Sequence, residues 1–189
     1  MDRRHFLTCL GVAIVATPSA ASARPASWAV KLDGGNDLPN LHRITSKFYR
    51  SGQPTAQGII TASKAYGIRT IVSLNDKPDE STLTGLKLVH VPMSAFKTAD
   101  EDDPQLARSL AAIQRGLARG PTLVHCQHGK DRTGGIVAVW RILYQGWSKE
   151  AAIREMNEGG FGYSNWLFSN ARHIRSLDIE KLRKQVEAL

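Results

Sequence analysis

The sequence lacks a hydrophobic run long enough to cross a membrane. The apolar stretch near its start, Phe6 to Ala16, has 11 residues, whereas a transmembrane helix needs about 20. That length is typical of the core of a secretory signal, and Ala21-Ser22-Ala23 has the small-residue pattern that signal peptidase cleaves. We therefore predict a signal peptide at residues 1–23, with a short buried helix of a cytosolic domain as the alternative.

The charged start of this segment bears on the export route. Arg3-Arg4-His5-Phe6-Leu7 resembles a twin-arginine signal, although a Sec signal can also begin with two arginines. We predict an exported, periplasmic protein with no membrane span once the signal is removed, and we favour the twin-arginine route over Sec.

Cysteine is scarce as well, because Cys9 and Cys126 are the two in the chain. Cleavage after Ala23 would remove Cys9 and leave Cys126 without an internal disulfide partner. A lone thiol in an exported protein is either buried and inert, paired between chains, or reactive.

Acidic residues are few relative to basic ones. The chain has 25 Lys and Arg against 17 Asp and Glu, a net charge of +8. A basic surface suits anionic substrates or an anionic membrane face. Nucleic-acid binding is not expected, since no basic stretch is interleaved with aromatic residues.

Strands and helices alternate along the rest of the chain. We predict strands at 47–50, 68–74, 86–92 and 122–125, the second and third of them buried, and helices at 54–66, 106–119 and 136–143, with two or three more helices after these. Gly67 and Gly120 follow two of the helices as stop signals. This alternation predicts an α/β fold with a mostly parallel central sheet flanked by helices.

One decapeptide, His125-Cys-Gln-His-Gly-Lys-Asp-Arg-Thr-Gly134, carries most of the chemistry. It lies between a predicted strand and a predicted helix, where open α/β sheets bind ligands. We expect Gly129 and Gly134 to let the backbone bend sharply so that N–H groups can surround a phosphate. The N-terminus of the following helix favours the same anion and a thiolate at Cys126. Arg132 would face the cysteine, with a planar guanidinium that matches two phosphoryl oxygens.

Each of these residues also has an ordinary structural explanation. A cysteine at a strand end is commonly a small buried hydrophobe, and an arginine at a helix start or a glycine in a turn is unremarkable. Their combination in one strand–loop–helix unit favours a functional site.

The decapeptide resembles the signature of the cysteine-based protein tyrosine phosphatase superfamily, and in particular of its dual-specificity branch. Further segments, from about Leu41 to Tyr163, are similar to exported bacterial members: Tyr49–Pro54, 68–74, Tyr144–Trp147 and Gly159–Gly162. The resemblance implies a phosphatase domain at 41–189, preceded by an N-terminal extension at 24–40.

The resemblance also implies a role for each loop residue. Cys126 would attack phosphorus and form a phosphocysteine intermediate, Arg132 would bind the equatorial oxygens, and Thr133 would help the thiolate leave. His125 would support the thiolate, or would simply be a satisfied histidine at a strand end. The remaining residues would line the phosphate loop: Gln127, His128, Gly129, Lys130 and Asp131.

The family places its general acid on a loop upstream of the cysteine, which here reads Ala99-Asp-Glu-Asp-Asp-Pro104. Asp100 matches the family acid best, and Asp102 is the alternative because this loop is longer than in similar proteins. Asp103, directly before Pro104, is explained as a helix N-cap.

Substrate class is left open between two hypotheses. The first is a phosphorylated protein, with phosphotyrosine favoured and phosphoserine or phosphothreonine not excluded. The second follows from Lys130, a further cation that suits phosphoinositides or inositol phosphates, although Lys130 can equally be a solvated charge paired with Asp131. A non-enzymatic phosphate-binding module is a distant third.

Other chemistries are not expected. An arsenate reductase would need further thiols, and His125 and His128 have no second His or Cys pair at the spacing of a zinc site. We therefore predict no metal and no cofactor.

Overall fold

The protein folds around one six-stranded sheet in the computed structural model, which describes residues 25, 27–79, 81, 85–93, 104–162 and 169–189. The strand order is β1-β2-β3-β6-β4-β5. The strands are β1 (Val30–Lys31), β2 (His42–Arg43), β3 (Phe48–Ser51), β4 (Thr70–Ser73), β5 (Lys87–His90) and β6 (Thr122–His125). Strands β3, β6, β4 and β5 run parallel, while β1 and β2 add an antiparallel edge. The predicted α/β fold is confirmed.

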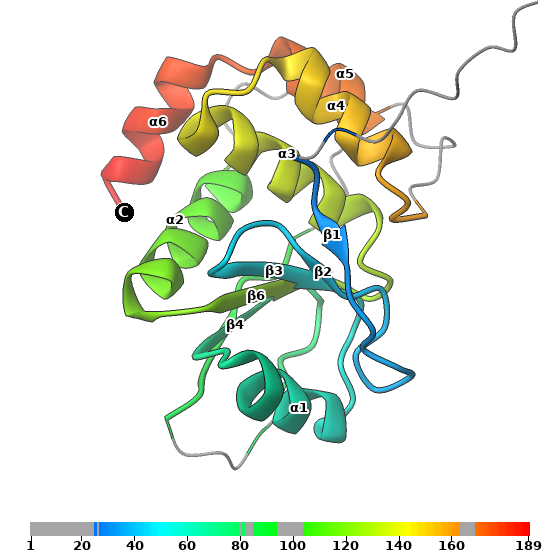
Figure 1. The fold of residues 1–189 in the computed structure, drawn as a ribbon. Coiled ribbons are helices and arrows are strands. Elements are labelled where there is room, and N and C mark those ends of the chain that lie inside the picture. The colour runs from blue at the N-terminus through cyan, green and yellow to red at the C-terminus, as the bar shows by residue number, and fades with distance from the viewer. Residues whose placement is uncertain (1–24, 26, 80, 82–84, 94–103, 163–168) are drawn as a thin grey trace, which may run out of the picture.

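Six helices among the described residues cover the two faces of this sheet unequally (Figure 1). One face carries α1, and the other carries the remaining five. The helices are α1 (Ala56–Tyr66), α2 (Pro104–Arg119), α3 (Asp131–Gln145), α4 (Lys149–Glu158), α5 (Ser169–Ser176) and α6 (Ile179–Glu187). None of these helices is both long and apolar enough to span a bilayer.

Each face of the sheet has its own apolar core because side chains alternate along a strand. Tyr49, Ile71 and Leu123 are neighbours in register and pack with Ile59 of α1. Phe48 and Val124 belong to the larger core beneath α2 and α3. Arg50, two residues after Phe48, therefore points toward the α3 face of the sheet.

Local signals set the helix ends. Thr55 caps α1 by accepting a hydrogen bond from the Gly58 N–H, and Gly67 ends α1 in the left-handed conformation, as predicted. Pro104 begins α2, as the Asp-Pro pair suggested. Helix α3 begins at Asp131, five residues before its predicted start, because the glycines and polar residues that precede Ile136 hid its first turn.

Two strand predictions need correction. Strand β5 was expected to be buried, but it is the sheet edge, and Lys87 and His90 are exposed. Strands β1 and β2 were not predicted, because two residues each give no alternation to detect. Within the predicted 24–40 extension, residues 29–40 contribute β1 and the fully buried Ala29 and Leu38 to the fold.

A buried ion pair fixes α3 relative to α4. Arg141 donates two hydrogen bonds, of 2.8 and 2.6 Å, to the Glu155 carboxylate, whose Oε1 also accepts from the Ala29 N–H at 2.6 Å. The Arg141 guanidinium also lies 4.3 Å from the Trp147 ring centroid. Because the decapeptide runs into the first turn of α3, this pair helps to fix the helix that positions the loop.

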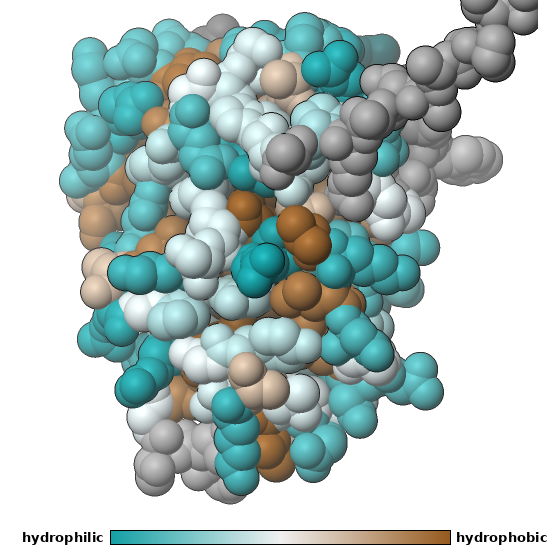
Figure 2. Space-filling view, in the orientation of Figure 1, coloured by the Kyte–Doolittle hydropathy of each residue, from teal (hydrophilic) through white to brown (hydrophobic). Residues whose placement is uncertain are grey.

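Most of the surface in view is hydrophilic (Figure 2). Among the described residues, the large hydrophobic side chains that are clearly exposed are Val30, Tyr144 and Leu189.

Candidate active site

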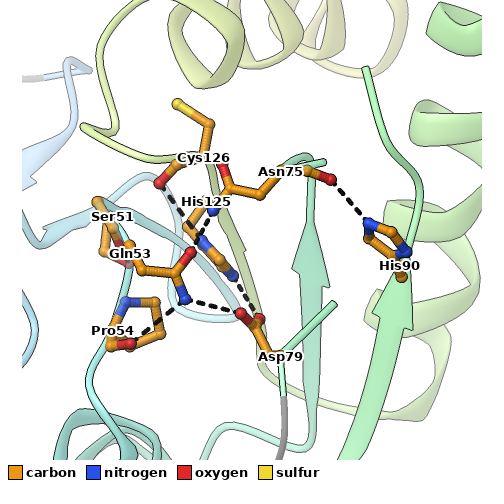
Figure 3. Close-up of polar contacts among 9 residues, drawn as sticks. Ser51, Gln53, Pro54, Asn75, Asp79, His90, His125 and Cys126 are labelled. Carbon is orange, nitrogen blue, oxygen red and sulfur yellow. Dashed lines mark hydrogen bonds and ion pairs between the residues drawn. The ribbon is translucent and has the colours of Figure 1, made fainter. Parts of the chain in front are cut away.

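The loop that joins β6 to α3 brings the decapeptide together at the carboxyl ends of the parallel strands. Cys126 directly follows β6 and is 3% exposed, and Asp131 begins α3. Cys126 is the one cysteine among the described residues, and it is free. Its sulfur points away from His125 (Figure 3).

The two glycines of the loop serve different purposes. Gly129 has φ +68°, and a Cβ there would lie 2.4 Å from the Ser51 carbonyl oxygen, so both conformation and space require glycine. Gly134 was predicted to permit a bend, which is wrong: it lies in the first turn of α3. A Cβ at Gly134 would come within 3.2 Å of the Met156 side chain, so close packing of α3 on α4 explains it.

Arg132 reaches back from α3 to the ends of neighbouring segments. Its NH1 group donates to the carbonyl oxygens of Leu74, at 3.0 Å, and of Met93, at 3.3 Å. The Asp76 carboxylate lies 3.9 Å away but is 91% exposed, so this ion pair contributes little. The carbonyls, and not Asp76, therefore orient the guanidinium.

A pocket of about 510 Å³ opens beside this arginine. It is lined by Gln53, Asn75, Asp76, Lys77, Pro78, Gln127 and Arg132. Three of these side chains are amides and none is aromatic. The pocket can therefore receive a polar, anionic group next to the loop.

His125 is the centre of a hydrogen-bond network (Figure 3). Its Nε2 lies 2.6 Å from an Asp79 carboxylate oxygen, and both side chains are almost completely buried. Its Nδ1 faces the Cys126 carbonyl oxygen at 3.4 Å. Both ring nitrogens thus face oxygen atoms, so the His125 ring joins Asp79 to the start of the loop.

Asp79 continues the network toward the pocket. Its second carboxylate oxygen accepts from Gln53 Nε2 at 2.7 Å, and the Gln53 oxygen accepts from the Asn75 side-chain amide. The Asn75 carbonyl in turn accepts from His90 Nε2 at 2.7 Å. His125 is therefore linked, through Asp79, to Gln53 and Asn75, which line the pocket.

The protonation of Asp79 reflects this setting. Burial on its own raises the pKa of Asp79, but the hydrogen bond and charge of His125 and the bond from Gln53 outweigh it. The net effect is a pKa below the ordinary value for an aspartate. Asp79 is therefore ionised at neutral pH, and its carboxylate bonds to the His125 ring.

The other predicted residues of the loop differ in exposure. Thr133 is fully buried, and its hydroxyl has no hydrogen-bond partner among the described residues. Gln127 and His128 are exposed, whereas Lys130 is half-buried with its side chain against Gly162. The backbone of Asp131 accepts a hydrogen bond from Asn170 at 3.0 Å. The decapeptide therefore contains a buried hydroxyl, that of Thr133, and a second cation besides Arg132, which is Lys130.

The predicted general acids, Asp100 and Asp102, lie outside the described residues, as does Asp103. Sequence reasoning also missed Asp79, Gln53 and Asn75. Asn75 and Asp79 lie two and six residues after the end of β4, and polar residues after a central strand of an open α/β sheet are a detectable signal. The segment was interpreted as a simple turn because of its Asn-Asp-Lys-Pro sequence.

Similarity to known proteins agrees with this geometry. The family model described as "DSP-PTPase phosphatase fused to NAD+ Kinase" matches residues 25–165. The chain is a dual-specificity member of the protein tyrosine phosphatase family. It is 35% identical to the dual specificity protein phosphatase TpbA of Pseudomonas aeruginosa over 92% of this chain and 77% of that protein.

Solved structures and a second group of relatives extend the similarity. A crystal structure of TpbA superposes with a TM-score of 0.74 and 31% identity, over 86% of this chain and 98% of TpbA. Inositol diphosphatase SIW14 of Saccharomyces cerevisiae is 29% identical over 75% of this chain, which spans 50% of SIW14. This chain is therefore a phosphatase, similar both to a protein phosphatase and to an inositol diphosphatase.

Proposed function

We propose that this phosphatase hydrolyses phosphate monoesters on proteins, with phosphotyrosine as the favoured substrate, through a phosphocysteine intermediate on Cys126. The observation that carries the proposal is the placement of Cys126 at the end of β6, directly before Gln127, which lines a polar pocket together with Arg132. A second support is the 35% identity to a dual specificity protein phosphatase.

The reaction has two displacements at phosphorus. In the first, the Cys126 sulfur attacks, the bond to the leaving oxygen breaks, and that oxygen takes a proton from an acid, for which Asp100 is the candidate. In the second, water attacks the phosphocysteine, the same acid residue takes the proton, and the sulfur leaves as a thiolate. No step uses a metal or a cofactor.

Three groups would assist these displacements. Arg132 binds equatorial oxygens bidentately and stabilises the charge that develops there. The Thr133 hydroxyl, buried in the first turn of α3, has a proton to donate to the departing sulfur. His125 holds the base of the loop through Asp79. Gln127, His128, Gly129, Lys130 and Asp131 contribute backbone N–H groups or charge to phosphate binding.

We place the site of action outside the cytoplasm. The proposal rests on the predicted signal at residues 1–23, with a periplasmic phosphatase domain at 41–189 after the 24–40 extension.

Inositol phosphates are the second candidate substrate. The pocket beside Arg132 is lined by amides and by Lys77, and no aromatic side chain among the described residues lines it to stack on a tyrosine ring. Amides can bond to ring hydroxyls, and Lys77 and Lys130 add positive charge for further phosphates. The 29% identity to an inositol diphosphatase points the same way.

A substrate panel separates the two candidates. We expect kcat/KM for phosphotyrosine peptides to exceed that for inositol diphosphates and phosphoinositides by about 10-fold or more. A tenfold ratio corresponds to a free-energy difference of about 1.4 kcal/mol. A preference of that size for the inositol substrates would establish the second candidate. Lys77→Gln is the matched control, because it should lower kcat/KM only for substrates that carry several phosphates.

A further inference from the structure

Three successive carbonyl groups of the phosphate loop accept hydrogen bonds from the N-terminal part of the chain. Gln127 O accepts from the Gln53 N–H at 3.0 Å. His128 O accepts from Asn40 Nδ2 at 3.1 Å. Gly129 O accepts from Asn40 Nδ2 at 3.3 Å and from Arg50 NH2 at 2.6 Å. Donors from the N-terminal part of the chain thus hold three successive carbonyls.

Holding a carbonyl also orients the N–H of the same peptide group, because the group is planar and trans. A carbonyl held on the outer side of the loop leaves the N–H of the next residue facing the inner side. The N–H groups concerned belong to His128, Gly129 and Lys130, and among the described residues none of them has a hydrogen-bond partner in the protein. These are groups that a bound phosphate requires.

Asn40, which donates to two of these carbonyls, has an unusual backbone conformation. Among the described residues it is the one non-glycine residue with positive φ, at 55°. Asparagine tolerates the left-handed region better than most residues, but such conformations persist only where surrounding contacts enforce them. The Asn40 carbonyl accepts from His42 Nδ1 at 3.0 Å, and the His42 ring packs edge-on against Phe161.

Arg50 reinforces the same loop from the α3 face of the sheet. It is 1% exposed, and its guanidinium carbon lies 3.8 Å from the Phe161 ring centroid. Burial lowers the pKa of Arg50 to about 10, against opposing contributions from Glu155 and Cys126. Arg50 therefore stays charged at neutral pH and places a buried cation behind the loop.

We propose that Asn40 is a positioning residue for phosphate binding, which acts by holding the His128 and Gly129 carbonyls outward. Its side chain also donates to Phe161 O at 3.0 Å, so one amide joins the N-terminal segment, the phosphate loop and the segment after α4. Arg50 shares the Gly129 carbonyl. This role of Asn40 rests on the proposed function in one respect, which is that the ligand of the loop is a phosphoryl group.

The test replaces Asn40 by Asp, which keeps the shape but loses the donors, and by Gly, which keeps the left-handed backbone and loses the side chain. The control is Asp37→Ala. Asp37 lies in the same segment as Asn40, and its side chain accepts a hydrogen bond from the Thr55 hydroxyl. Among the described residues, none of its hydrogen bonds is with the phosphate loop. The measurements are kcat and KM with a phosphotyrosine peptide, the inhibition constant of vanadate, and Tm.

We expect both Asn40 variants to raise the vanadate inhibition constant about 10- to 100-fold, since each lost hydrogen bond accounts for about a factor of 10. Asp37→Ala should leave that constant unchanged. A purely structural Asn40 would lower Tm, and kcat in proportion to the folded fraction, while vanadate inhibition stayed within about twofold of wild type; this result would overturn the proposal.

Vanadate binding measured by calorimetry separates this inference from the proposed function. Wild-type protein that binds vanadate but hydrolyses no phosphate ester would contradict the proposed function alone. Equal vanadate affinity of wild type and Asn40→Asp would contradict the positioning role alone.

Discussion

We expect Cys126→Ser to abolish turnover while the protein still binds phosphate analogues. A serine hydroxyl is a far weaker nucleophile than a thiolate, and His125 is not placed to activate it, because both of its ring nitrogens already face oxygen atoms. The loop geometry depends on Gly129, Asn40 and Arg50, none of which is altered. We expect kcat to fall by about 10⁵-fold or more, as when a covalent nucleophile is removed in other enzymes.

Steady-state kinetics with a phosphotyrosine peptide and a vanadate titration by calorimetry check this expectation. Cys9→Ser in the full chain is the matched control and should retain full activity, since Cys9 belongs to the predicted signal. Activity of Cys126→Ser within about tenfold of wild type would place the nucleophile elsewhere.

We expect Asp100→Asn to slow the hydrolysis of a phosphotyrosine peptide by about 10²- to 10⁴-fold, the range for a positioned general acid. A poor leaving group such as tyrosinate needs the proton, whereas an activated aryl ester departs without it. The effect on phosphocysteine formation from the activated ester should therefore be much smaller. The alkaline limb of kcat/KM against pH should flatten, because the group that must be protonated is gone.

Two neighbouring aspartates are the controls. Asp102→Asn should leave the dependence on the leaving group unchanged, and Asp103→Asn should cost about 1 kcal/mol of stability as a weakened helix cap. If Asp102→Asn shows the leaving-group dependence and Asp100→Asn does not, Asp102 is the acid and the alignment with the family is shifted by two residues.

The chemistry of the site could be predicted because it is contiguous in sequence. Cys126, Gly129 and Arg132 lie within seven residues, so one loop indicates the proposed nucleophile, the turn and the proposed phosphate-binding cation together. Strand β6 before the loop and α3 after it also show strong local patterns. Local sequence was sufficient here because the functional unit is itself local.

The support for the loop could not be predicted, because it comes from distant parts of the chain. Asp79 lies 46 residues from His125, Arg50 lies 79 from Gly129, and Asn40 lies 88 from His128. Arg50 is a charged residue at the end of the predicted strand 47–50, yet it is 1% exposed. Only the register of β3 beside β6 places its guanidinium behind the loop.

Trapping the covalent intermediate tests the central claim most directly. Wild-type protein mixed with a phosphotyrosine peptide and quenched in acid within milliseconds should carry one phosphoryl group on the peptide that contains Cys126, as seen by mass spectrometry. The adduct should be absent from Cys126→Ser and should decay at the rate of turnover. A phosphoryl group on another residue, or turnover with no adduct on Cys126 at any quench time, would contradict the phosphocysteine mechanism.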